Sequence, residues 1–393
     1  MLAATVRVTR DLDAAEEAVQ DAYVQALRTW ASVGVPDRPG AWLTTVARRA
    51  ALNVMRRRQT LESKLPLLLA PENTEMPEAD SETIPDDRLR LIFICCHPAL
   101  AQEAQIALTL RLVCGVATPD IAHAFLVAEA TMAARLTRAK KKIAAAHIPY
   151  AVPSAAALPE RIGAVLTVIH LLYSAGHTAH SGDDLVRDDL TGRALDLARM
   201  LRMLLPADRE AAGLVALLLV HHARRATRTD VNGRLLRLEE QDRSAWDGGL
   251  IAEADRLVVA ALSAGPPGRF TLQAAIAALH AQAPSYAETD WPQILTLYDA
   301  LLRIWPSPVV ALNRAVAVSM VDGPEAALAE VEALERDGRL AGYRYLPATK
   351  ADLLHRLGRD AEAAEAYQAA LALSGNTAEQ EFLADRVRSA LMP

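Results

Sequence analysis

Residues 118–143, TPDIAHAFLVAEATMAARLTRAKKKI, predict two short helices that are joined by a tight break and end in a run of lysines. Thr118 can cap the first helix, and Pro119 is tolerated there because the first turn needs no hydrogen bond from its nitrogen. Leu126 and Val127 form the break. The pattern fits a DNA-reading module, but a helical hairpin with a solvated basic end has the same outline. The positions of the charges decide between the two.

The second helix of this stretch has an apolar seam beside a basic face. Residues at helical spacing predict its buried side, and they are Met132, Leu136, Ala139 and Ile143. A second set lies one position earlier, about 100° away around the helix, and consists of Thr131, Arg135, Arg138 and Lys142. One side can therefore dock on the protein while the other meets phosphates and base edges. The alternative is a solvent-exposed helix whose lysines bind no nucleic acid.

Positive charge is confined to two islands in the first 147 residues. Residues 1–60 and residues 103–147 each have a net charge of +3, whereas residues 61–102 have a net charge of -5. Because the whole chain has a formal charge of -6, residues 148–393 contribute -7. We therefore expect contact with a polyanion only from the first 147 residues.

The first island contains two amphipathic helices. In residues 11–30, DLDAAEEAVQDAYVQALRTW, small apolar residues line one face and an acidic surface lies on another. Residues 41–58, AWLTTVARRAALNVMRRR, have an apolar stripe that consists of Trp42, Val46 and Ala50 with Leu43 and Leu52. The same segment carries five arginines and no acid, namely Arg48, Arg49, Arg56, Arg57 and Arg58. A solvated helix end is the alternative interpretation of this cluster.

The rest of the chain predicts further helices and two linkers. Residues 61–85 are rich in proline and acidic residues, and residues 148–159, IPYAVPSAAALP, are apolar and rich in proline. Farther along, Gly323 and Gly358 each precede an alanine-rich helix, 35 residues apart. This spacing is close to the 34-residue period of tetratricopeptide (TPR) repeats. We expect an all-α chain whose residues 160–393 form a TPR-like extension.

The composition argues against several classes of protein. No run of eighteen apolar residues predicts a membrane span, and the beginning of the chain lacks the pattern of a secretory signal. Cys95, Cys96 and Cys114 lie in apolar surroundings, so we expect buried free thiols and a reducing cytoplasm. Phosphate-binding loops and the motifs Cys-x-x-Cys and His-Glu-x-x-His do not occur. No cofactor and no metal site are therefore expected.

Together these segments resemble a bacterial sigma factor of the sigma-70 family, of the extracytoplasmic-function type that carries a long C-terminal TPR-like extension. Residues 11–30 resemble the region-two helix that binds the clamp-helix coiled coil of the polymerase β′ subunit. Residues 39–58 resemble the next helix, which melts and reads the minus-ten promoter element. Residues 88–100, RLRLIFICCHPAL, and residues 118–143 resemble region four, which docks a helix-turn-helix at the minus-thirty-five element.

The resemblance implies roles for individual residues. Core-polymerase binding is implied for Asp13, Glu17, Gln20 and Asp21. DNA binding in region two is implied for Arg48, Arg49, Asn53, Arg56 and Arg57. DNA binding in region four is implied for Glu129, Thr131, Arg135, Arg138 and Lys142. Residues 309–334 and 349–373 resemble the extension.

The sequence departs from the family pattern in three places. The chain begins inside the first helix of region two, so we expect this region to be N-terminally short. Arg48-Arg49 replaces the common Arg-Asn pair and Asn53 replaces the usual Asp, which concerns the minus-ten sequence preference. In the extension, residues 174–177, Ser-Ala-Gly-His, replace a commoner Asn-Glu-Gly-Tyr, so no role of that Glu is transferred to this chain.

The expected function is that of a non-enzymatic initiation factor in the cytoplasm. Region 2 (1–60) and region 4 (86–147) are separated by the acidic linker 61–85, and they would hold the two promoter elements. The acidic helix would dock on RNA polymerase core, whose β′ clamp helices and β flap are the implied contacts. After the linker at 148–159, the extension (160–393) would regulate activity by gripping a peptide or protein partner. No membrane partner is expected.

Two other classes of function are open. One is a one-component helix-turn-helix transcription regulator with a C-terminal sensor domain, which would bind DNA without polymerase. The other is an enzyme with a pocket in 160–260, around His177, Arg224, Asp247 and Gly248, although no acid–base pair stands out there. Asp247-Gly248-Gly249 is most simply a turn and the start of a helix.

Overall fold

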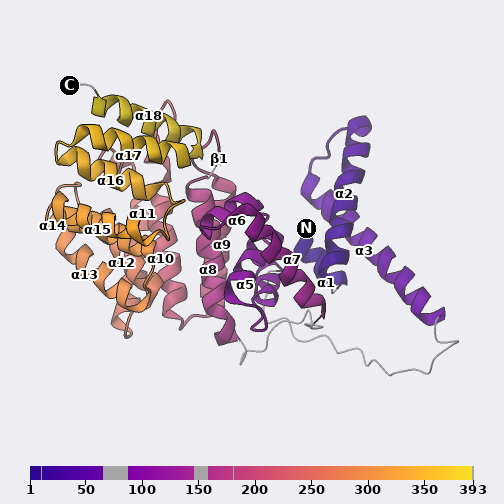
Figure 1. The fold of residues 1–393 in the computed structure, drawn as a ribbon. Helices are drawn as coiled ribbons and strands as arrows, with labels where there is room; N and C mark the ends of the chain where they lie inside the picture. The colour runs from indigo at the N-terminus through magenta and orange to yellow at the C-terminus, as the bar shows by residue number, and fades with distance from the viewer. Residues whose placement is uncertain (10, 65–86, 146–157, 180, 392–393) are drawn as a thin grey trace. The chain divides into compact units, whose positions relative to one another are not determined.

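The chain is almost entirely helical wherever its structure is described (Figure 1). The computed structural model describes residues 1–9, 11–64, 87–145, 158–179 and 181–391. The predicted all-α fold is confirmed. The chain forms two compact units, which are Met1–Gly115 with Ala133–Val165 and Val116–Met132 with Leu166–Pro393. Within the described ranges, no helix combines the length and the apolar character that crossing a bilayer requires.

The first three helices form a small bundle with an alanine-lined seam. They are α1 (Leu2–Thr9), α2 (Leu12–Val33) and α3 (Pro39–Lys64). Asp11 caps α2, because its carboxylate accepts a hydrogen bond from a first-turn N–H at 3.0 Å. Ala22 and Ala26 of α2 pack with Leu43 and Ala47 of α3, and side chains this small let the two helices approach closely. Helix α3 ends inside the predicted acidic linker, and residues 65–86 lie outside the described residues.

Four helices follow, and a buried glutamine stabilises the turn between the first two of them. The four are α4 (Asp87–Cys95), α5 (Gln102–Leu112), α6 (Thr118–Ala124) and α7 (Glu129–Ala145). Gln105 Nε2 donates to the carbonyls of His97 and Leu100, both at 2.9 Å, between α4 and α5. The three cysteines are free and buried, as predicted. Burial raises the pKa of the Cys96 thiol to about 12, so this thiol stays protonated and inert.

The break between α6 and α7 lies where the sequence predicted it. Leu126 has a φ of 54°, and Val127 N–H donates to the Ala122 carbonyl at 3.0 Å. The left-handed conformation at Leu126 reverses the chain between the two helices. The predicted cap is wrong: Ala117 occupies the N-cap position and forms no side-chain capping bond, and Thr118 is already the first helical residue.

The remaining helices form the extension, which is a succession of helical hairpins. Its helices are α8 (Leu158–His177), α9 (Asp188–Leu204), α10 (Arg209–Ala223), α11 (Gly248–Ser263), α12 (Arg269–Gln282), α13 (Trp291–Ile304), α14 (Pro308–Val321), α15 (Pro324–Asp337), α16 (Tyr345–Arg356), α17 (Asp360–Leu373) and α18 (Thr377–Leu391), with 3-10 turns at Arg225–Thr227 and Arg243–Ala245. From α9 to α18, each helix contacts the next one along the chain. Residues 146–157, which include most of the second predicted linker, lie outside the described residues.

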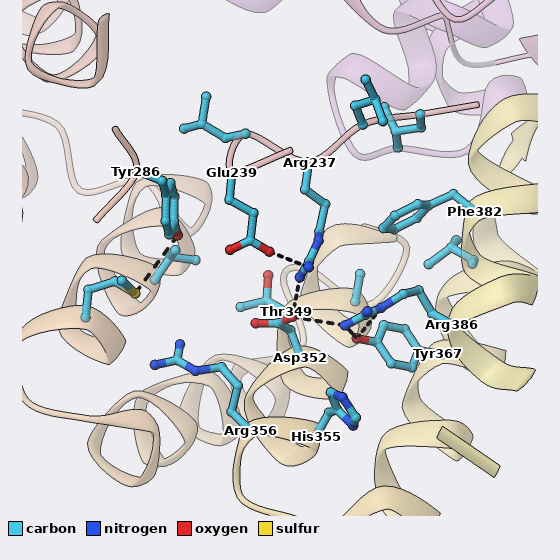
Figure 2. A pocket seen from close by; sticks show the side chains of 17 residues that line it. Arg237, Glu239, Tyr286, Thr349, Asp352, His355, Arg356, Tyr367, Phe382 and Arg386 are labelled. Carbon is cyan, nitrogen blue, oxygen red and sulfur yellow. Dashed lines mark hydrogen bonds and ion pairs between the residues drawn. The ribbon is translucent and has the colours of Figure 1, made fainter. Parts of the chain in front are cut away.

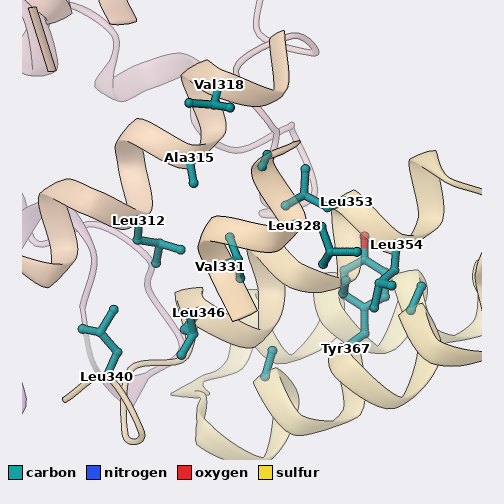
Figure 3. Close-up of a cluster of buried hydrophobic side chains, with 14 of the residues drawn as sticks. Leu312, Ala315, Val318, Leu328, Val331, Leu340, Leu346, Leu353, Leu354 and Tyr367 are labelled. Atoms are coloured by element: carbon teal, nitrogen blue, oxygen red, sulfur yellow. The ribbon is translucent and has the colours of Figure 1, made fainter. Parts of the chain in front are cut away.

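The helix pairs α14–α15 and α16–α17 are the two repeats that the glycine spacing predicted. Gly323 and Gly358 lie in the turns of the two pairs with φ of 97° and 73°, a region that glycine adopts without steric strain. Both pairs contribute to one apolar core (Figure 3), which includes Leu312, Ala315, Val318, Leu328, Val331, Leu353, Leu354 and Tyr367. The stacking fits a TPR-like extension.

Helix α10 lies at the centre of the first half of the extension and contacts α9, α11 and α12. Eleven of its fifteen residues are buried, and the others lie at its two ends. At Gly213 the backbone of α12 comes so close that an added Cβ would lie 2.6 Å from the Thr271 nitrogen. Glu210 caps α12 from outside, because its carboxylate accepts from the backbone N–H groups of Phe270 at 2.8 Å and Thr271 at 3.1 Å.

A short parallel pairing joins the beginning of the extension to its last helix. The strands are β1 (Ser181–Gly182) and β2 (Gly375–Asn376). Asn376 is fully buried, and its Nδ2 donates to the carbonyls of Gly182 and Asp184, both at 3.0 Å. Its Oδ1 accepts from the Ala378 N–H at 3.1 Å at the start of α18. One side chain therefore holds both segments.

Gly213→Ala should destabilise the protein by about 1–3 kcal/mol, because the new methyl group would overlap the α12 backbone and force the two helices apart. The matched control is Gly192→Ala in α9, where an added Cβ meets nothing within 4 Å. This control should be neutral or stabilising by up to about 1 kcal/mol, since alanine favours a helix. Urea denaturation of both variants measures the difference, and equal midpoints would contradict the close contact.

Candidate nucleic-acid and polymerase interfaces

The four residues predicted to bind polymerase all lie exposed on α2. They are Asp13, Glu17, Gln20 and Asp21. Their spacing places them on one side of the helix, opposite the buried alanines. No ion pair joins the three acids to any residue that the structure describes. The acidic surface is therefore available to a partner.

The sequence interpretation missed the apolar continuation of this surface. Tyr23, Val24 and Leu27 follow on α2 with exposed side chains, and Leu27 is 77% exposed. Val24 and Leu27 lie at helical spacing from Gln20, so the exposed side of α2 is acidic at its beginning and apolar towards its end. A mixed surface of this kind is typical of a protein-binding face. In the sequence, this apolar surface is indicated only by the helical spacing of Val24 and Leu27 from Gln20.

Helix α3 presents the predicted basic face to solvent. Arg48, Arg49, Asn53 and Arg56 are exposed and lie within an arc of about 140° on one side of the helix. The Arg57 side chain lies outside the described residues. The predicted apolar stripe is partly wrong. The buried positions are Leu43, Ala47 and Ala51, whereas Leu52 is 42% exposed on the basic face, because the smallest side chains face α2.

Helix α7 has the predicted register. The seam is buried at all four of its positions, which are Met132, Leu136, Ala139 and Ile143. On the basic face Thr131, Arg138 and Lys142 are exposed, and Glu129 is exposed in the first turn. These side chains can reach a ligand without any change in the fold.

Two of the cations on α7 already have partners within the chain. Arg135 is half-buried, and its guanidinium lies 3.9 Å from the Glu103 carboxylate. Lys140 is paired with Glu16 of α2. Arg138 is therefore a better probe of nucleic-acid contact than Arg135, because replacing it breaks no ion pair with a residue that the structure describes.

The extension contains a cavity of about 690 Å³ (Figure 2). It is bounded by the segment Leu235–Glu239 and by side chains from α14, α16, α17 and α18. Most of its lining is apolar and includes Val316, Met320 and Phe382. The volume is sufficient for a small molecule or a few side chains of a peptide.

Charged side chains along one wall of the cavity are linked to one another. The Asp352 carboxylate lies 3.4 Å from the Arg237 guanidinium and 3.5 Å from that of Arg386, and Arg386 also donates to the Tyr367 hydroxyl at 3.1 Å. Arg237 pairs with Glu239 as well. These bonds tie the segment Leu235–Glu239 to α16 and α18. Because the pairs are partly exposed, each contributes little stability and can rearrange around a ligand.

The residues of the alternative enzyme pocket have structural partners. Asp247 caps α11, because its carboxylate accepts from the N–H groups of Gly249 at 2.9 Å and Leu250 at 3.0 Å. The predicted turn and helix start at this position are confirmed. Arg224 lies against the Trp246 ring, and Arg228 donates to the His177 carbonyl. In the described part of the chain, no three His, Cys, Asp or Glu side chains are arranged to hold a metal ion.

Comparison with known proteins matches three parts of the chain to families. Residues 2–60 match Sigma-70 region 2 and residues 90–143 match Sigma-70, region 4. Residues 161–262 match a Family of unknown function (DUF6596). An uncharacterized protein of Rhizobium meliloti (strain 1021) is 46% identical over 388 residues, which is 97% of this chain and 91% of the relative.

The helix-turn-helix and the region 2 bundle thus define a helical, DNA-binding transcription factor. The chain therefore contains regions 2 and 4 of the sigma-70 family, which supports a sigma-70 family factor. Regions 2 and 4 support a sigma-factor-like role in transcription initiation and imply RNA polymerase core and promoter DNA as partners.

Asp247→Ala should lower stability by about 0.5–2 kcal/mol, since two N–H groups at the start of α11 would lose their acceptor. Asp247→Asn is the matched control and should retain most of this stability, because its amide oxygen can still accept. Thermal unfolding of both variants measures the difference. If alanine and asparagine proved equivalent to aspartate, the capping role would be wrong.

Proposed function

We propose that the protein is an alternative sigma factor of the extracytoplasmic-function type, with a C-terminal extension that regulates it. The observation that supports this most directly is that the sigma-70 regions carry two solvent-exposed faces of different chemistry. One is the acidic and apolar side of α2, and the other is the basic side of α7. The first suits a protein partner and the second suits DNA. In its role with polymerase, the factor acts in the cytoplasm.

The face of α2 would bind the β′ clamp helices of the polymerase core. Asp13, Glu17, Gln20 and Asp21 would provide the polar contacts, and Leu27 would provide an apolar contact near the centre of the interface. Burying a side chain that is 77% exposed in the free chain contributes favourably to association. The acids would mainly steer the encounter and select the partner.

The basic faces of α3 and α7 would hold the two promoter elements. Phosphate contacts from exposed arginines set the affinity, whereas base-edge contacts set the choice of sequence. On α3, Asn53 lies between Arg49 and Arg56 and can bond a base edge without carrying charge. On α7, Thr131 and Arg138 are the exposed residues that we place at base edges, with Lys142 at a phosphate.

The regulatory role rests on a contact between helix α6 and the extension, which belong to one compact unit. The Arg344 guanidinium donates to His123 Nε2 of α6 at 2.8 Å. Arg344 itself is buried and paired with Glu379 of α18 at 2.7 Å. We propose that this contact supports α6 of the helix-turn-helix, and that a peptide or protein partner bound at the cavity of the extension acts through it.

Run-off transcription with purified core polymerase tests the sigma-factor role, and promoter-specific transcripts should appear only when this chain is added. Leu27→Asp should weaken core binding by on the order of 1–2 kcal/mol, because it places a charge in an apolar contact. Arg138→Ala should leave core binding intact but reduce discrimination at the upstream element by about 1–3 kcal/mol.

Two controls match these variants. Val33→Asp adds the same charge to α2 at another exposed apolar position, which points about 120° away from Leu27 around the helix. It should bind core normally. Lys141→Ala removes an exposed cation of α7 outside the basic face and should have a smaller, sequence-independent effect. Specific DNA binding that is unchanged by core polymerase would instead support a one-component regulator.

His123→Ala should reduce promoter-specific transcription several-fold, which corresponds to about 1 kcal/mol of lost coupling. The ion pair between Arg344 and Glu379 remains in this variant, so the extension should keep its stability. Arg359→Ala, which removes an exposed side chain that is paired with Glu362 and does not line the cavity, is the control. Unchanged transcription together with unchanged upstream-element dependence would refute the coupling.

A further inference from the structure

Arginine, histidine and tyrosine side chains gather inside the extension at the ends of α8 and α10. Tyr173 and His177 come from the last two turns of α8, and His221 comes from the last turn of α10. The ring centres of His177 and His221 are 5.1 Å apart, and that of Tyr173 is 5.7 Å from His177. Arg224 and Arg228 follow in the turn after α10. The cluster belongs to one compact unit.

Three guanidinium groups of this region have no carboxylate partner among the described residues. Arg224 and Arg243 lie 4.9 Å and 4.8 Å from the centre of the Trp246 ring. Arg224 donates to the Gln241 side chain at 3.3 Å, and Arg243 donates to the backbone carbonyls of residues 280 and 283. Arg228 donates to the His177 carbonyl and to the Thr178 hydroxyl. All of these acceptors are neutral, so the charge of the arginines remains uncompensated.

Several buried polar atoms in the cluster have no hydrogen-bond partner. They are Arg224 Nε, Arg243 Nη2, the Tyr173 hydroxyl and His177 Nδ1. Buried donors without an acceptor are rare in native proteins, because each costs the free energy of its lost hydration. Three unpartnered groups that can donate, namely the two guanidinium nitrogens and the Tyr173 hydroxyl, lie around one group of cations and indicate that an acceptor-rich molecule belongs there.

The surrounding titratable groups leave the cluster positive. Burial, followed by Arg224, lowers the pKa of His221 to about 3, and burial and Arg228 lower that of His177 well below its usual value. Both imidazoles are therefore neutral near pH 7. Glu379 lies close enough to act on Arg228, but it is paired with Arg344. Asp188 lies close enough to act on Tyr173 and on His222, and Asp247 acts on His222 beside the cluster.

We propose that the cluster around Tyr173, Arg224 and Arg228 binds a small molecule through an oxyanion, either a phosphate or a carboxylate group. Guanidinium groups match the oxygens of both anions and form strong, charge-assisted hydrogen bonds with them. The Tyr173 hydroxyl adds a neutral donor. A bound oxyanion would satisfy the unpartnered donors and neutralise the uncompensated charge. The proposal concerns the extension alone and does not depend on polymerase binding.

Calorimetric titration and thermal unfolding of the full-length protein test this site. The probes are inorganic phosphate, sulfate and citrate, with sodium chloride at the same ionic strength as the reference. At least one oxyanion should bind saturably in the titration and raise the unfolding temperature progressively with its concentration, whereas chloride should not. Preference for phosphate or sulfate would identify a phosphate-bearing ligand, and preference for citrate would identify a carboxylate.

Three variants locate the binding. Tyr173→Phe removes one oxygen and keeps the packing, so it should fold normally and weaken oxyanion binding about tenfold. Arg224→Gln should weaken it further. Arg303→Gln removes an exposed arginine of α13 and should bind like the parent protein.

The absence of saturable binding for all three oxyanions would overturn the proposal. A rise in unfolding temperature that chloride reproduces would overturn it too, since this would be charge screening alone. Binding that Tyr173→Phe leaves unchanged would place the anion elsewhere. Because Tyr173→Phe is expected to fold, this result stands even where Arg224→Gln does not.

Discussion

The contact between α10 and α12 determines the arrangement of the first half of the extension. The Gly213 backbone lies against that of Thr271, and the Glu210 carboxylate accepts two N–H groups at the start of α12. Both features are possible at only one position and one register of α10 relative to α12. Helix α10 is buried through its middle turns and is packed on several sides. The contact at its N-terminal end therefore also determines the position of its C-terminal end. The imidazole of His221 and the arginine-rich turn after α10 are placed in consequence.

The two kinds of charged residue in this protein are arranged according to opposite physical requirements. On α2, α3 and α7 most of the described charges are exposed, and the adjoining alanine or aliphatic seam carries the packing. These faces retain their hydration until a partner binds. In the extension, arginines lie in the interior, where they contact aromatic rings and donate to backbone carbonyls. Charge that has no opposite charge beside it is energetically costly in this environment. A bound anion would stabilise this interior by compensating the buried positive charge. The charges on the exposed faces are stabilised by water and need no bound anion.

Local periodicity predicted the exposed faces well, and it failed where two helices compete for the same apolar residues. The register of α7 was correct because Met132 and Leu136 repeat at helical spacing beside a polar set. On α3 the predicted stripe included Leu52, but the closest packing against α2 selects Ala47 and Ala51 instead. The exposed Leu27 on α2 was missed, since a sequence does not distinguish an apolar residue at an interface from one in the core.

The sequence by itself determined the helices, the glycine turns of the repeats and the faces that meet solvent, because these depend on residues within a few turns of one another. Only the tertiary structure decided which charges find partners. His123 and Arg344 meet across 221 residues of chain, and Asn376 joins segments that are 194 residues apart. The cavity, the arginines without a carboxylate partner and the contact between α6 and Arg344 arise in this way. No local pattern encodes them, since each depends on how distant helices pack.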